Sequence, residues 1–153
     1  TQEISWQQYN LSFYDAWQEG LRVYNPNISP RRFEWLNPAT GEITPVKNPT
    51  AIQTNIQLPK PCPIELIPPT IEHNLLIGEV LHLKCLDINT MSFHESINDH
   101  MQLRLIVYQE NSILLNEIIA NHIQKLQPET FFVQQNHLFF IQNSNQIVSY
   151  KLV

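Results

Sequence analysis

Glycine is nearly absent from this chain, which holds only Gly20, Gly41 and Gly78 among its 153 residues. Loops that bind nucleotide phosphates need closely spaced glycines, because backbone N–H groups must approach the phosphate oxygens. These three glycines lie far apart, which excludes P-loops and dinucleotide-binding fingerprints of the usual kind. The chain also contains no CxxC pair, no HExxH motif and no Gly-x-Ser-x-Gly elbow. The common sequence signatures of catalysis are therefore missing.

Charged residues are scarce as well, at 15% of the chain, and the formal net charge is −5. The longest basic run is the pair Arg31-Arg32. Nucleic-acid-binding surfaces neutralise phosphates with clustered Lys and Arg, so we expect no nucleic-acid partner. No apolar run approaches the roughly 20 residues that span a bilayer, so we expect no membrane insertion.

Cysteine is limited to Cys62 and Cys85, which are too few for a disulfide framework. Cys62 lies among prolines and Cys85 lies in an expected strand, so we predict two free thiols. A disulfide would instead indicate an oxidising compartment. Free thiols favour a cytoplasmic protein.

A strand–turn–strand pattern occurs twice, at residues 33–43 and 83–93. In each copy four residues end in Leu, and Asn or Asp, two further residues and Thr follow. An Asn or Asp side chain at a turn entry accepts hydrogen bonds from backbone N–H groups two or three residues on. Repeats of about this length are typical of stacked β units. We therefore expect a mainly β fold of antiparallel hairpins and a meander, arranged as a propeller or a partial propeller.

Ten of the eleven prolines lie between Pro26 and Pro69. Proline fixes φ and removes a donor from the strand ladder, so regular central strands are not expected in this region. The densest part, residues 58–69, is predicted to be an extended connecting segment on the surface. We expect residues 1–153 to form a single domain that includes this segment, since the chain is long enough for a hydrophobic core.

Residues 5–19 are predicted to form a short helix. Ser5 and Gln8 have the spacing of a capping box, and Gly20 suits the position after a helix end. Four aromatic residues then share one helical face: Trp6, Tyr9, Phe13 and Trp17. Apolar residues at 9, 11 and 13 also alternate, which leaves a strand as the alternative.

From about residue 74 onward the sequence is typical of β structure. Residues 101–108 alternate between apolar and polar, and three short strands are expected at 130–133, 138–141 and 147–152. Residues 112–126 fit two structures. Their apolar spacing suits a helix, whereas the isoleucine-rich composition and the β flanks favour a hairpin that turns at 110–112.

Aromatic residues are concentrated near the N-terminus, where eight of the fifteen lie within the first 35 residues. Such rings either fill a core or form a stacking surface for a sugar or a protein partner. The candidate binding residues are Trp6, Tyr9, Trp17 and Trp35.

The segment His94-Glu95-Ser96-Ile97-Asn98-Asp99-His100 holds two imidazoles and two carboxylates within seven residues. These groups ligate divalent metals when a turn brings them together. The spacing matches no specific zinc motif, and a polar loop between strands is the alternative. The candidate metal ligands are His94, Asp99 and His100, and His82 on the preceding strand is a further candidate.

Four strings in the second half of the chain carry a family resemblance: LDINTM at 86–91, PETFFV at 128–133, NHLFFI at 136–141 and VSYKL at 148–152. On these strings, residues 81–153 resemble the C-terminal part of an uncharacterised bacterial family, a domain of unknown function with propeller-like hairpins. Thr40-Gly41-Glu42 also resembles the turn of quinoprotein-type propeller blades. The family has no assigned activity, so the resemblance transfers no catalytic residue. Closed propellers use about four to eight blades, more than a chain of this length supplies at this repeat.

These observations predict a non-catalytic binding or scaffolding module without a cofactor, which binds a protein partner or a second copy of itself. One alternative is a structural subunit of a larger assembly. The other is a metal-dependent hydrolase that uses the loop at 94–100.

Overall fold

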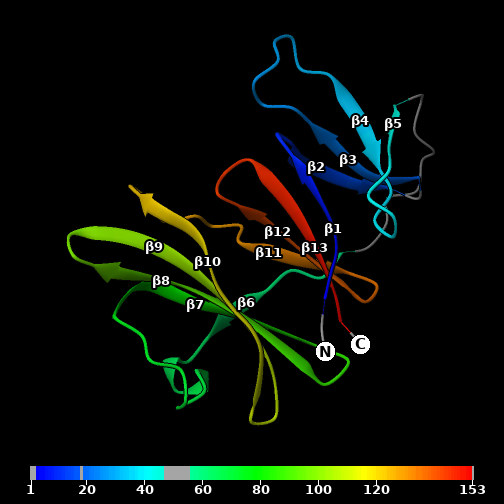
Figure 1. The fold of residues 1–153 in the computed structure, drawn as a ribbon. Coiled ribbons are helices and arrows are strands. Elements are labelled where there is room, and N and C mark those ends of the chain that lie inside the picture. Colours follow the sequence, from blue (N-terminus) through cyan, green and yellow to red (C-terminus); the bar gives the residue numbers. More distant parts are fainter. Residues whose placement is uncertain (1–2, 18, 47–55, 153) are drawn as a thin grey trace.

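The computed structural model describes residues 3–17, 19–46 and 56–152. In this part of the chain the protein is mainly β and consists of three antiparallel sheets (Figure 1). The prediction of a mainly β, antiparallel fold is therefore confirmed. One short 3-10 helix, η1 (Ile64–Leu66), interrupts the strands.

We name the three sheets by their place in the fold. The N-terminal sheet has the order β2 (Ser12–Trp17), β3 (Gly20–Tyr24), β4 (Phe33–Leu36), β5 (Ile43–Pro45). The long sheet has the order β10 (Ser112–Ile123), β9 (His100–Gln109), β8 (Ile88–Ile97), β7 (Leu75–Cys85), β6 (Lys60–Cys62). The central sheet has the order β1 (Ile4–Tyr9), β13 (Gln146–Lys151), β12 (His137–Gln142), β11 (Phe131–Gln134).

The predicted helix over residues 5–19 is wrong, because residues 5–17 form strands β1 and β2 with a turn between them, and residue 18 lies outside the described part of the chain. Asn10 separates the two strands with a φ of 57°, a left-handed conformation that Asn adopts more readily than most residues. β1 pairs with β13 from the far end of the chain, and β2 pairs with β3. Pairing with distant residues decides the structure here, since the local pattern fits both a helix and a strand.

The hairpin predicted around residues 110–112 is confirmed. β9 and β10 pair directly, with Gln109 opposite Ser112. The short strands expected near the C-terminus are confirmed as the meander β11–β12–β13. Cys62 and Cys85 are free thiols, as predicted.

The two copies of the repeated hairpin differ in their turns. In the first, the Asn37 Oδ1 accepts hydrogen bonds from the N–H groups of Ala39 and Thr40, at 2.9 and 3.3 Å, as an Asx turn requires. In the second, Leu86 and Asp87 form a two-residue turn with φ values of 53° and 62°. Both residues at positive φ are typical of a tight type I′ hairpin. The sequence repeat therefore corresponds to two different loops between paired strands.

The central sheet is buried on both faces, which explains its run of apolar residues (Figure 1). Successive side chains of a strand point to opposite faces. In β12, Leu138 and Phe140 pack into a cluster with the long sheet, whereas Phe139 and Ile141 pack into a cluster with the N-terminal sheet. The three sheets thus form a stack in which the central sheet lies between the other two.

The outer face of the long sheet is covered by the proline-rich part of the chain. Ile67 and Ile71 pack on Val80, Met91 and Phe93 of the strands below. The predicted connecting segment 58–69 is only partly a loop, since β6 pairs with β7 along the sheet edge. An edge strand tolerates proline because its outward N–H needs no partner strand.

Candidate functional site

The candidate metal ligands His94, Asp99 and His100 are not gathered into one site. Strand alternation places His94 and His100 on opposite faces of the long sheet, and Asp99 lies in the turn between β8 and β9. His82, the further candidate, bonds through Nε2 to the Asn89 Oδ1 at 2.9 Å. Within residues 3–17, 19–46 and 56–152, no group of three or more His, Cys, Asp or Glu side chains could hold a metal ion.

His94 has a structural partner. Its side chain is 5% exposed on the face toward the central sheet, and its Nε2 accepts a hydrogen bond from the Gln127 N–H at 3.0 Å. Two residues away, the Ser92 and Thr130 hydroxyls bond to each other at 2.7 Å. Burial lowers the pKa of His94, which favours the neutral ring that this contact needs. These bonds hold the connection from β10 to β11 on β8.

Acidification is expected to weaken this contact. A lowered folded-state pKa means that the unfolded chain binds the proton more readily, so stability falls as the pH drops from about 6.5 through the folded value. In His94→Gln the side-chain oxygen can still accept from the Gln127 N–H. Between pH 7 and pH 5 we expect the free energy of unfolding of this variant to fall by about 1 kcal/mol less than that of the native protein. Urea unfolding followed at both pH values measures this. His73→Gln, a change at an exposed ring, should follow the native pH dependence; an identical decline in all three proteins would contradict the assignment.

The candidate binding residues are dispersed over the fold. Trp6 points into the contact between two sheets, where its Nε1 donates to the Pro38 carbonyl at 2.9 Å and its ring centroid lies 5.8 Å from that of Phe139. The turn that holds Gly41 packs on this indole, and a Cβ at Gly41 would lie 2.8 Å from the ring. Trp6 therefore fixes the β4–β5 turn to the central sheet. Tyr9 is 62% exposed at the end of β1.

Trp17 and Trp35 lie on the outer face of the N-terminal sheet, the face turned away from the central sheet. Register places Trp35 opposite Arg22, and Arg22 opposite Asp15. Directly opposed residues share a face. A register shift between Phe13 and Asp15 interrupts the alternation of β2 beside these residues.

Arg22 is the centre of a group that we call the Arg22 cluster: Tyr14, Asp15, Trp17, Arg22 and Phe33. Arg22 forms a bidentate ion pair with Asp15, in which Nε donates to Oδ1 at 2.8 Å. Its guanidinium carbon lies 4.8 Å from the ring centroid of Tyr14, 5.1 Å from that of Phe33 and 5.5 Å from that of Trp17. These distances suit cation–π contacts.

The Asp15 carboxylate determines the electrostatics of the Arg22 cluster. The hydrogen bond to Asp15 raises the pKa of Arg22 above its usual value. The negative charge of Asp15 acts in the same direction, whereas burial of Arg22 acts against it. The guanidinium thus stays charged while its carboxylate partner balances that charge. Tyr14 is 49% exposed beside this pair, so the cluster presents aromatic surface around a neutralised ion pair.

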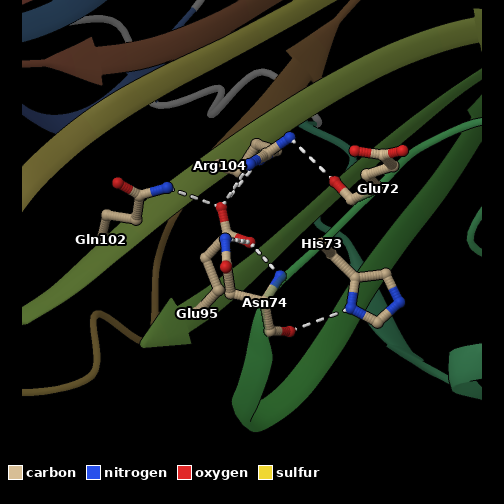
Figure 2. Close-up of polar contacts among 6 residues, drawn as sticks. All are labelled: Glu72, His73, Asn74, Glu95, Gln102 and Arg104. Atoms are coloured by element: carbon tan, nitrogen blue, oxygen red, sulfur yellow. Dashed lines mark hydrogen bonds and ion pairs between the residues drawn. The ribbon is translucent and has the colours of Figure 1, made fainter. Parts of the chain in front are cut away.

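A densely bonded polar group centres on Glu95, a fully buried carboxylate on the outer face of the long sheet (Figure 2). Its Oε1 accepts from the Gln102 Nε2 at 2.6 Å and from the Arg104 Nε at 2.8 Å. Its Oε2 accepts from the backbone N–H of Asn74 at 2.9 Å and from that residue's side-chain amide at 3.2 Å. Arg104 also donates to the Glu72 carbonyl at 3.2 Å.

This network holds the segment before β7 on strands β8 and β9. Burial alone would raise the pKa of Glu95, but the hydrogen bonds from Asn74, Gln102 and Arg104, with the charge of Arg104, lower it overall. A carboxylate with both oxygens occupied is a poor metal ligand or general base. Glu95 lies inside the segment at 94–100, and its role there is structural.

Comparisons with protein-family models, with curated proteins and with solved structures return no match. The resemblance to a propeller-like bacterial family therefore stays a prediction. Among the described residues, no helix is both long and apolar enough to cross a membrane.

Proposed function

We propose that this protein is a non-catalytic binding or scaffolding module of propeller-like construction, and that it contacts a protein partner through the Arg22 cluster. The observation that carries this proposal is the group of aromatic side chains around a neutralised ion pair on the outer face of the N-terminal sheet. Aromatic residues and arginine are enriched in the energetically dominant parts of protein interfaces.

The propeller-like description is supported by the order of the strands. Propellers repeat four-stranded antiparallel sheets that pack face to face. Here the N-terminal strand β1 completes the sheet formed by the C-terminal strands β11–β13, so the two ends of the chain share one sheet (Figure 1). A partner that packed on the N-terminal sheet would extend the stack by a further layer.

The two ends of the stack differ in their surface. The outer face of the long sheet is covered by residues 63–74, the connection between β6 and β7, which packs on it through Ile67 and Ile71. The outer face of the N-terminal sheet carries Tyr14, which is half exposed, and the partly exposed ring of Phe33. Aromatic surface of this kind loses contact with water when a partner binds, which favours association.

The proposal predicts that Tyr14→Ala weakens partner binding by about tenfold or more, as truncation of a central aromatic contact does. Tyr9→Ala is the matched control, because Tyr9 is equally aromatic, more exposed and located on β1. A tagged pull-down from the native host at physiological salt identifies the partner, and calorimetry with that purified partner measures both variants. Equal affinities for Tyr14→Ala and the native protein would contradict the proposed face.

The alternative role as a structural subunit is favoured by one feature, the long edge strand β10. Its side chains Ile113 and Ile118 are exposed, and the edge of an outermost strand can pair with another chain, apart from the Ile119 carbonyl, which accepts from the Asn143 N–H at 2.8 Å. Sedimentation at low micromolar concentration distinguishes the two roles, since a stable monomer argues against obligate assembly. The geometry around residues 94–100 gives the metal-dependent hydrolase no support within the described residues.

A further inference from the structure

A mainly apolar cavity of about 410 Å³ lies between the N-terminal sheet and the central sheet. Phe13 and Leu21 line it from the N-terminal sheet, and Phe132 and Ile141 line it from the central sheet. Ile56 lines it from the segment that leads toward β6. The volume falls in the range of about 300–1,000 Å³ that is typical of small-molecule sites.

Aromatic rings form a row along the wall of this cavity. The ring centroids of Phe13 and Phe132 lie 4.5 Å apart, and those of Phe132 and Phe139 lie 5.0 Å apart with an interplanar angle of 15°. Phe139 is fully buried, whereas Phe13 and Phe132 are partly exposed. A flat aromatic ligand can continue this row, since offset-stacked rings are favourable at such separations. The wall therefore favours a planar guest over a flexible chain.

The polar side chains that line the cavity determine the charge of its guest. Among the described lining residues they are Glu129, Ser12, Tyr14, Tyr24 and Thr130, and the Thr130 hydroxyl already bonds to Ser92 at 2.7 Å. The described lining residues include no Lys, Arg or His. With one carboxyl group and no cationic side chain, this set disfavours an anion and favours a group that is positive and donates hydrogen bonds.

We propose that this inter-sheet cavity binds a small planar aromatic cation. The ring system lies against Phe13 and Phe132, and the cationic group faces Glu129. This site shares Tyr14 with the Arg22 cluster, but Glu129 and Leu58 lie outside that cluster, so variants at these two residues test the cavity independently of the proposed protein contact.

Proflavine, a planar aromatic cation, is a suitable fluorescent probe, and 1-anilinonaphthalene-8-sulfonate is its anionic counterpart. We expect saturable 1:1 binding of proflavine and no comparable binding of the anion. Glu129→Gln should weaken the binding of proflavine by about threefold to fivefold, because it removes a partly exposed ion pair. Glu110→Gln, in the exposed turn between β9 and β10, changes the net charge equally and should leave the affinity unchanged.

Ile141→Trp fills the cavity from the central sheet and should abolish proflavine binding. Leu58→Arg places a positive charge on a lining residue that is 56% exposed, so it should strongly weaken the binding of the cation. This variant tests the proposal even if the tryptophan variant fails to fold. Circular dichroism verifies that each variant keeps its β structure. Absence of saturable proflavine binding to the native protein would overturn the proposal. Equal weakening by Glu129→Gln and Glu110→Gln, or unchanged binding to Leu58→Arg, would also overturn it.

Discussion

Replacing Arg104 with Met is expected to destabilise the protein by about 3–5 kcal/mol at pH 7, because it leaves the buried carboxylate of Glu95 without its countercharge. Glu95 has no exposed surface, and Arg104 contacts it through two nitrogens, at 2.8 Å for Nε and 2.6 Å for the terminal nitrogen. The same substitution removes the donor to the Glu72 carbonyl, so the segment before β7 also loses one of its attachments to the sheet. Equilibrium unfolding in urea gives the free energy directly.

Arg32→Met is the matched control, since Arg32 lies exposed in the β3–β4 connection and its loss should cost no more than about 0.5 kcal/mol. The double variant Glu95→Leu/Arg104→Met should recover part of the loss, because a buried ion pair can be replaced by apolar side chains at little cost. Recovery stays incomplete, as Asn74 and Gln102 still lack their acceptor. A cost below about 1 kcal/mol for Arg104→Met would show that water reaches Glu95.

The lowered pKa of Glu95 determines how the stability of the native protein and of Arg104→Met depends on pH. A carboxyl group with a lowered folded-state pKa contributes stability that is present above its unfolded value, about 4.3, and lost as the pH falls through the folded value. The native protein should therefore lose this contribution below about pH 4. Without Arg104, burial dominates and favours the protonated form of Glu95. The difference in the free energy of unfolding between Arg104→Met and the native protein should therefore become smaller in acid.

The second large effect concerns β12, where neighbouring residues on opposite faces should both be costly to truncate. Leu138→Ala is expected to cost about 2–5 kcal/mol and Phe139→Ala about 3–5 kcal/mol, since each side chain is fully buried and leaves a cavity. Leu75→Ala, at a side chain that is 75% exposed, should change stability by no more than about 0.5 kcal/mol. Thermal unfolding of the three variants measures these costs.

This comparison tests the position of the central sheet. If one face of β12 were exposed to water, one of the two neighbouring substitutions would have little effect, because only inward-facing side chains would leave a cavity. Similar losses at Leu138 and Phe139 would confirm that sheets pack against both faces. A loss confined to one of them would contradict the stack of three sheets.

The C-terminal strands were predictable because their signals are local. Short apolar runs such as residues 138–141 are bounded by Asn- and Gln-rich turns, and no partner information is needed to recognise them. β1 was not predictable, since its partner β13 lies at the other end of the chain and its aromatic spacing also fits a helix. The stacking order of the sheets has no local signal either.

The sites were harder to predict than the strands. The segment at 94–100 collects metal-ligating residue types in sequence, but strand alternation separates His94 from Glu95 and His100 in space. Trp17 and Trp35 were identified as candidate binding residues, whereas Tyr14, Arg22 and Phe33 were missed. Their association depends on the register of β2, β3 and β4, and no spacing in the sequence encodes that register.

Hydrogen exchange of the native protein with and without its captured partner tests the proposed binding face most directly. We expect the partner to slow exchange in β2, β3 and β4, where the Arg22 cluster lies, and to leave the exchange of β10 unchanged. Protection confined to β10, with no change in the N-terminal sheet, would contradict the proposal and indicate association through the strand edge.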